Sequence, residues 1–95
     1  KNDIIEICPV IILNRGDRTI INLTILKSYT FQWDEDDVAI VLGYGSLYNH
    51  SYAPNAEYHN DLENNAIAFK AIRNIKAGEE ITINYNGDPK SKELV

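Results

Sequence analysis

Two short runs carry most of the information in this chain: Asn49-His50-Ser51, followed by Pro54-Asn55, and Gly78-Glu79-Glu80-Ile81-Thr82-Ile83-Asn84-Tyr85. The first is a polar cluster in an irregular stretch, and the second is typical of a strand that ends in a lone tyrosine. Taken alone, the first run has an ordinary alternative interpretation, a loop whose Asn and Ser side chains cap backbone groups. The pair is more informative than either run, because composition and periodicity do not by themselves place these residues together.

The surroundings of the first run strengthen the pattern. Gly43-Tyr44-Gly45-Ser46-Leu47-Tyr48 comes immediately before it, and Pro54-Asn55-Ala56 closes it. Over Leu42 to Tyr85 the sequence closely resembles the SET-domain family of protein-lysine methyltransferases. The resemblance implies a mostly β, SET-domain-like fold of several short sheets with a carboxy-terminal pseudoknot. In such a knot the last segment passes through a loop, which most folds avoid, and the two runs meet.

The same resemblance implies the site residues. It implies that Asn49 and His50 bind S-adenosylmethionine, with the Asn49 side chain near the amino-acid end of the cofactor and the His50 backbone near its adenine. It also implies that Tyr85 places its hydroxyl at the point of methyl transfer. Tyr29 lies close to where compact members of the family keep a second active-site tyrosine.

Other aromatic residues allow two interpretations. Tyr44 and Tyr48 line the cofactor or lysine pocket, or they pack beneath it. Phe31 and Trp33 alternate with polar residues after Tyr29, and we expect both to be core aromatics on one face of a strand.

The chemistry that the resemblance implies needs tyrosines and no metal. A lysine amine with a pKa of about 10.4 is neutral in only about one molecule in a thousand near pH 7.4, so forming the nucleophile costs about 4 kcal/mol. An apolar aromatic channel and the positive sulfur of the cofactor both lower this pKa. Tyrosine hydroxyls then orient the amine for attack on the methyl group. His50 and His59, with Asp61 and Glu63 nearby, match no standard set of metal ligands.

Composition limits the class of protein. The chain has 95 residues, which predicts one SET-like domain over residues 1–95, and its 44% apolar content is ordinary for a globular protein. A single cysteine, Cys8, excludes a disulfide framework within the chain. The net charge of −5 argues against direct binding of nucleic acid and favours a basic, lysine-containing protein or peptide. No run approaches the roughly 20 apolar residues of a membrane span, so we expect no membrane contact and an intracellular protein, cytoplasmic or nuclear.

The apolar pattern predicts strands at residues 4–8, 10–13, 19–26, 29–33, 38–42, 66–72 and 81–85. Pro9 separates the first two, a turn covers residues 14–17, and the acidic residues 34–37 close a hairpin. We expect an irregular stretch over residues 42–65, a loose tail over residues 86–95, and no convincing amphipathic helix.

The chain also departs from the family pattern. It begins near the strand over residues 4–10, after the glycine-rich strand pair that opens a SET domain, so we expect the domain to be incomplete at its amino terminus. The cysteine-rich tail of many members does not follow Tyr85. A homodimer would cover apolar surface that so small a domain struggles to bury. Two functions follow: methylation of a lysine in a histone-like protein substrate, or a non-catalytic SET-like module that binds a basic peptide or protein partner.

Overall fold

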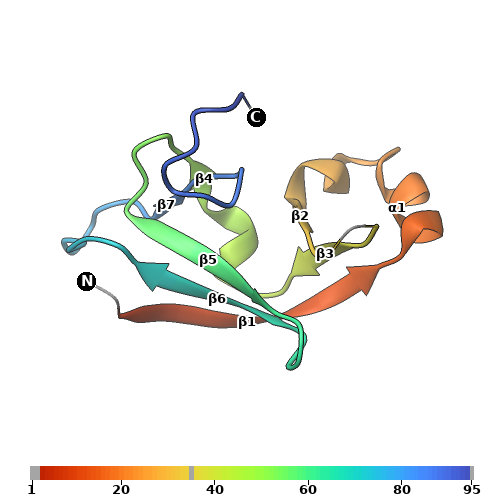
Figure 1. Ribbon diagram of the computed structural model, residues 1–95, viewed down its shortest axis with the longest axis horizontal. Helices are drawn as coiled ribbons and strands as arrows, with labels where there is room; N and C mark the ends of the chain where they lie inside the picture. Colours follow the sequence, from red (N-terminus) through yellow and green to blue (C-terminus); the bar gives the residue numbers. More distant parts are fainter. Residues whose placement is uncertain (1–2, 35, 95) are drawn as a thin grey trace. The chain divides into compact units, whose positions relative to one another are not determined.

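Short strands dominate the computed structural model, which describes residues 3–34 and 36–94 (Figure 1). In chain order the elements are β1 (Ile4–Leu13), α1 (Arg15–Ile21), the 3-10 helix η1 (Ile25–Tyr29), β2 (Thr30–Gln32), β3 (Val38–Val41), the 3-10 helix η2 (Tyr44–Leu47), β4 (Asn49–His50), β5 (Ala56–Asp61), β6 (Ala66–Ala71) and β7 (Thr82–Ile83). The larger sheet has the order β2-β3-β1-β6-β5, and β4 and β7 form a second sheet. The predicted mostly β architecture is confirmed.

The described residues divide into two compact units. The first unit comprises residues 3–7, 48–59 and 68–94, and the second comprises residues 8–34, 36–47 and 60–67. Both runs singled out in the sequence lie in the first unit. The organisation of residues 1–95 as a single domain stays a prediction.

The predicted hairpin of the second unit is confirmed. β2 and β3 pair antiparallel with Phe31 opposite Ala39, and β3 pairs antiparallel with the second half of β1. Phe31 and Trp33 are buried, as the alternation predicts, and they form the core with Val38 and Val41. Tyr29 does not continue this strand face, because it is the last residue of η1 and is 38% exposed.

The strand predicted over residues 19–26 is wrong, because α1 and η1 occupy this stretch. Its Ile and Thr residues favour a strand, but each helix begins at a capping residue. The Asn14 side chain accepts the N–H of Asp17 at 2.9 Å, and the Thr24 hydroxyl accepts the N–H of Leu26 at 3.1 Å. The expected turn at residues 14–17 is therefore the first turn of a helix. No helix in the described part of the chain is long and apolar enough to cross a membrane.

Pro9 does not divide β1 into two strands as predicted. β1 runs continuously through it, and its pairing with β3 begins at Val10, where Val41 is the partner. Pro9 lacks only a backbone donor, and its carbonyl still accepts the N–H of Leu42 at 2.9 Å. A proline at this position therefore removes no hydrogen bond from the β1–β3 register.

The stretch over residues 42–65 is more regular than predicted, since η2, β4 and β5 lie within it. In the second unit a tight turn connects β5 to β6. Asp61 accepts hydrogen bonds from the backbone and side chain of Asn64, and Asn65 takes a left-handed φ of 49°. Asparagine tolerates this conformation better than most residues, so Asn64-Asn65 is a turn signal rather than the sign of a long loop.

Side chains of the first unit hold the residues after Tyr85. The buried Asn84 side chain donates to the Ser91 carbonyl at 2.8 Å. The Glu93 carbonyl accepts from Tyr52 Oη and from Asn86 Nδ2, both at 2.8 Å. These hydrogen bonds connect the predicted loose tail to the residues that flank Tyr85.

Candidate active site

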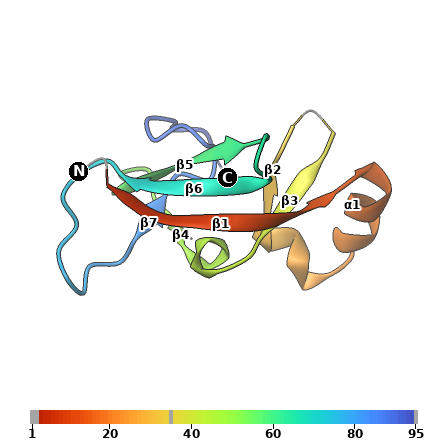
Figure 2. The ribbon, with the colours of Figure 1, turned by 90° about the horizontal axis from the view of Figure 1, so that it is seen from below.

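The parallel pair of β4 and β7 brings the two sequence runs side by side (Figures 1 and 2). Asn49 lies opposite Thr82, and His50 lies opposite Ile83. The N–H of Ser51 donates to the Ile83 carbonyl at 2.9 Å. The meeting of the two runs is confirmed, and the threaded connection of a pseudoknot stays a prediction.

Tyr85 is held at both ends just beyond this ladder. Its N–H donates to Nδ1 of His50 at 3.0 Å, and its hydroxyl donates to the Tyr48 carbonyl at 2.8 Å. Its ring centre lies 5.1 Å from that of His50. The residue is nevertheless 45% exposed, so a fixed hydroxyl lies on an accessible side chain.

His50 has one acceptor and one donor nitrogen in this arrangement. Because Nδ1 accepts the Tyr85 N–H, the neutral ring carries its proton on Nε2. That Nε2 is buried and has no hydrogen-bond partner among the described residues. The His50 ring also packs edge-on against Tyr52, with ring centres 4.4 Å apart.

Asn49 is exposed and faces a carboxylate. Its Nδ2 donates to Oε2 of Glu80 at 2.7 Å, which connects the two runs through their side chains. The Asn49 carbonyl oxygen and the Glu80 carboxylate are both acceptors, and together they suit a ligand ammonium group. These two acceptors match the ammonium at the amino-acid end of S-adenosylmethionine, and the role of Asn49 in binding it stays a prediction.

Tyr48 packs beneath the site. Its ring meets Phe69 edge to face at 5.1 Å, and its hydroxyl donates to Oε1 of Glu6 at 3.0 Å. The half-buried Tyr48 ring thus packs on a core residue, while its carbonyl accepts the hydroxyl of Tyr85, and whether Tyr48 also lines the pocket stays a prediction.

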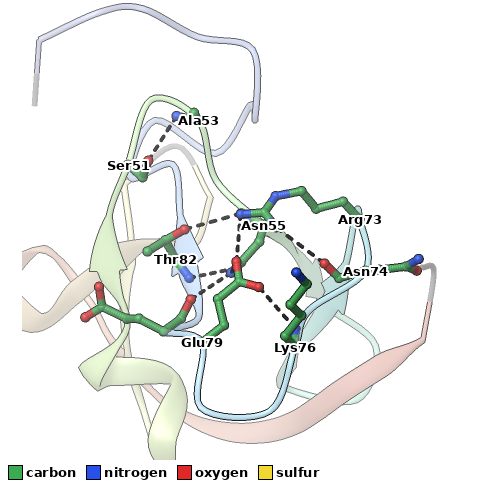
Figure 3. Close-up of polar contacts among 9 residues, drawn as sticks. Ser51, Ala53, Asn55, Arg73, Asn74, Lys76, Glu79 and Thr82 are labelled. Carbon is green, nitrogen blue, oxygen red and sulfur yellow. Dashed lines mark hydrogen bonds and ion pairs between the residues drawn. The ribbon is translucent and has the colours of Figure 1, made fainter.

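Asn55 joins the segment after β4 to the strand that leads to Tyr85 (Figure 3). It is 1% exposed, and its Oδ1 accepts the Thr82 N–H at 2.9 Å. Its Nδ2 donates to the Glu80 carbonyl at 2.7 Å and approaches Oε2 of Glu79 at 3.4 Å. Asn55 has no predicted role from the sequence, although its place directly after a proline in the first run is a signal, and its buried amide requires hydrogen-bond partners.

Glu79 extends this network to the turn before β7 (Figure 3). Its carboxylate accepts the Lys76 N–H at 3.1 Å and pairs with Arg73 at 2.9 Å. The Lys76 N–H, followed by the hydrogen bonds of Arg73 and Asn55, lowers the pKa of the Glu79 carboxyl below its ordinary value. An ionised Glu79 thus stabilises the turn that precedes β7.

Comparison with known proteins identifies the family. The family model described as "SET domain" matches residues 1–86. The chain belongs to the SET-domain family. This SET domain is 37% identical over 82 residues to a Schizosaccharomyces pombe protein named histone-lysine N-methyltransferase, H3 lysine-37 specific. The match covers 85% of this chain but 56% of that protein, so the chain spans little more than half of that relative's length.

A solved structure shows the same fold. The crystal structure of a Plasmodium falciparum protein assigned as a histone methyltransferase superposes on this SET domain with a TM-score of 0.63. The two share 37% sequence identity, and the match covers 90% of this chain and 74% of the other.

The remaining two predicted site residues belong to the second unit of the SET domain. Tyr29 ends η1 and is 38% exposed, and Tyr44 begins η2 and is 72% exposed. The structure thus gathers Tyr48, Asn49 and His50 around Tyr85, and the roles of all six predicted site residues stay predictions. In the part of the SET domain that the structure describes, no group of three or more His, Cys, Asp or Glu residues is placed to hold a metal ion.

Proposed function

We propose that this SET domain catalyses S-adenosylmethionine-dependent methylation of a lysine side chain in a protein substrate. The observation that supports this most strongly is the double anchoring of Tyr85, whose N–H and hydroxyl are both bound at the junction of the two motifs. The names of the two similar proteins point to the same class of reaction.

Asn49 and His50 are the proposed cofactor ligands. Asn49 offers its carboxamide beside the Glu80 carboxylate, and His50 offers its backbone at the end of β4. Tyr44 is the proposed further lining residue, and Tyr48 supports the pocket from beneath. When bound, S-adenosylmethionine supplies a methyl group on a positively charged sulfur, which is open to attack by a neutral amine.

Tyr85 orients the substrate amine. Its hydroxyl hydrogen is engaged by the Tyr48 carbonyl, so its oxygen would meet an N–H of the substrate lysine as an acceptor. This contact directs the nitrogen lone pair, and Tyr29 is the proposed second wall of the lysine channel. The chain's contribution to the rate is alignment together with desolvation of the amine, which lowers the lysine pKa.

The proposed substrate is a basic, lysine-bearing tail of the histone type. The net charge of −5 favours such a partner through long-range attraction. A histone substrate would place the protein inside the cell, in the nucleus or cytoplasm.

A methyl-transfer assay tests the proposal. Labelled S-adenosylmethionine is incubated with the chain and a panel of histone-tail peptides, and incorporation into lysine is measured. Tyr85→Phe is expected to reduce kcat by at least about 10²-fold, because the amine loses its orienting acceptor. Tyr52→Phe is the matched control, since it keeps the ring and removes a hydroxyl that donates to the Glu93 carbonyl.

The same variants separate catalysis from simple binding. In an enzyme, the lysine channel joins the cofactor site to the peptide site, so cofactor should strengthen peptide binding. Tight peptide binding that ignores cofactor, with no transfer by the wild-type chain, would instead favour the non-catalytic module.

A further inference from the structure

We propose that the His50 side chain is a positioning residue for Tyr85. Its Nδ1 fixes the backbone of Tyr85 and so couples the placement of the tyrosine to the cofactor-binding run. The catalytic meaning of this coupling rests on the proposed methyl transfer, while the hydrogen bond itself is measurable without it.

The backbone ladder does not reach Tyr85. β4 and β7 pair at Asn49↔Thr82 and His50↔Ile83, and the Ser51 N–H then binds the Ile83 carbonyl. Two residues later the Tyr85 N–H donates to a side chain, His50 Nδ1 at 3.0 Å. An imidazole of β4 thus continues the ladder beyond the end of its strand, where the backbone of β4 no longer runs beside β7.

The residues that hold the N–H and the hydroxyl of Tyr85 flank Asn49, one of the two proposed cofactor ligands. The hydroxyl is held by the carbonyl of Tyr48 and the N–H by the ring of His50, the residues on either side of Asn49. A shift of this three-residue segment therefore moves Tyr85 at both ends. Cofactor contacts made by the segment set the position of the orienting hydroxyl.

Of the two nitrogens of the His50 ring, only Nδ1 has a hydrogen-bond partner among the described residues. Nε2 of His50 is buried without a partner among the described residues, which is unfavourable for the ring. Nδ1, in contrast, meets the Tyr85 N–H with normal length. The position therefore requires an acceptor two bonds from Cβ and gains nothing from the second nitrogen.

Three substitutions separate the acceptor from the size of the side chain. His50→Asn keeps an acceptor, Oδ1, at the same number of bonds from Cβ as Nδ1. His50→Leu has nearly the same shape as asparagine and no acceptor. His50→Gln places its acceptor one bond further away, at the level of Nε2.

The first measurement is the hydrogen exchange of the Tyr85 amide by NMR, on the whole chain without cofactor. Loss of its acceptor in His50→Leu is expected to speed exchange by about tenfold or more, with wild-type rates at the core amides of β6. His50→Asn is expected to restore slow exchange, and His50→Gln is not. If the leucine variant does not fold, the comparison of wild type with the Asn and Gln variants still decides the result.

The second measurement is kinetic. We expect His50→Leu to lower kcat by about 10²-fold, because a misplaced hydroxyl no longer aligns the amine, and His50→Asn to recover most of it. The dissociation constant for cofactor should change less than about threefold, since the His50 backbone is retained. Equal Tyr85 exchange in the Leu and Asn variants would overturn the positioning role. Absence of transfer by the wild-type chain would overturn the proposed function and leave the exchange result standing.

Discussion

Asn55 acts as a strand neighbour of Thr82 through its side chain. Its Oδ1 accepts the Thr82 N–H at 2.9 Å while its Nδ2 donates to the Glu80 carbonyl at 2.7 Å. A side-chain amide thereby pairs with backbone groups of the segment that leads into β7. The clamp fixes the register of β7, which has only two residues with which to define it.

Removing this clamp is expected to destabilise the fold. Asn55→Ala leaves the N–H of Thr82 and the carbonyl of Glu80 without their partner at a buried position, so we expect a loss of about 2–3 kcal/mol in the free energy of unfolding. Urea denaturation measures it. Asn86→Ala removes amide contacts at an exposed position and should cost less than about 1 kcal/mol. Equal losses in the two variants would show that Asn55 is not a clamp.

The dependence of stability on pH should report the Glu79 network. The pKa of this carboxyl is lowered below its ordinary value of 4.5 in the folded protein. The ionised form therefore stabilises the fold fully above about pH 4.5, and this contribution is lost as pH falls through the lowered folded-state value. Glu79→Gln, which cannot ionise, is expected to lose stability less steeply than the wild type below pH 4.5.

Denaturation curves between pH 3 and pH 7 test this directly, because they give the free energy of unfolding at each pH. Glu63→Gln is the matched control, because its side chain is exposed in the turn between β5 and β6. An equally steep loss of stability below pH 4.5 in the wild type and in Glu79→Gln would contradict this role of Glu79. If Glu63→Gln differed from the wild type by as much as Glu79→Gln does, the effect would come from net charge instead.

Cofactor binding should depend on Asn49. Asn49→Ala removes the carboxamide that faces Glu80, so we expect the dissociation constant for S-adenosylmethionine to rise by about tenfold or more, the loss of one charge-assisted hydrogen bond. Isothermal titration calorimetry on the purified chain measures it. Asn22→Ala is a suitable control, because Asn22 is an exposed cap residue of α1 in the second unit. An unchanged affinity in Asn49→Ala would remove this residue from the cofactor site.

The meeting of the two runs could be predicted from the sequence because the evidence for it is local. The Asn49-His50 run and the strand ending at Tyr85 are each recognisable in a few residues, and the parallel pair of β4 and β7 joins them. The alternation of Phe31 and Trp33 likewise predicted two buried aromatics. Each of these inferences needs only neighbours in the chain or a motif at a known distance.

Contacts between distant side chains were beyond the same reasoning. Nothing in the sequence states that Asn55 binds the backbone of Thr82, because this contact exists only once the two segments have met. The error at residues 19–26 has a different cause. The Ile and Thr residues there favour a strand, and this propensity led to the wrong prediction. Asn14, a helix-capping residue visible in the sequence, favours the helix that forms.

Self-association of the chain should depend on the apolar residues of α1, of η1 and of the link between them. α1 buries no residue, and the exposed fractions of Ile20, Leu23 and Ile25 are 66%, 86% and 78%. A seven-residue helix without a buried face is marginal in water, so covering this surface with a second copy would stabilise it.

We expect sedimentation velocity to show a concentration-dependent dimer of the wild-type chain. Leu23→Glu should raise the dissociation constant of this dimer by at least about tenfold, because the dimer would bury an unpaired charge. Leu94→Glu, at a 93% exposed position in the tail, is the matched control and should leave the equilibrium unchanged. A monomer at all concentrations, or equal shifts in both variants, would exclude this surface as the dimer interface.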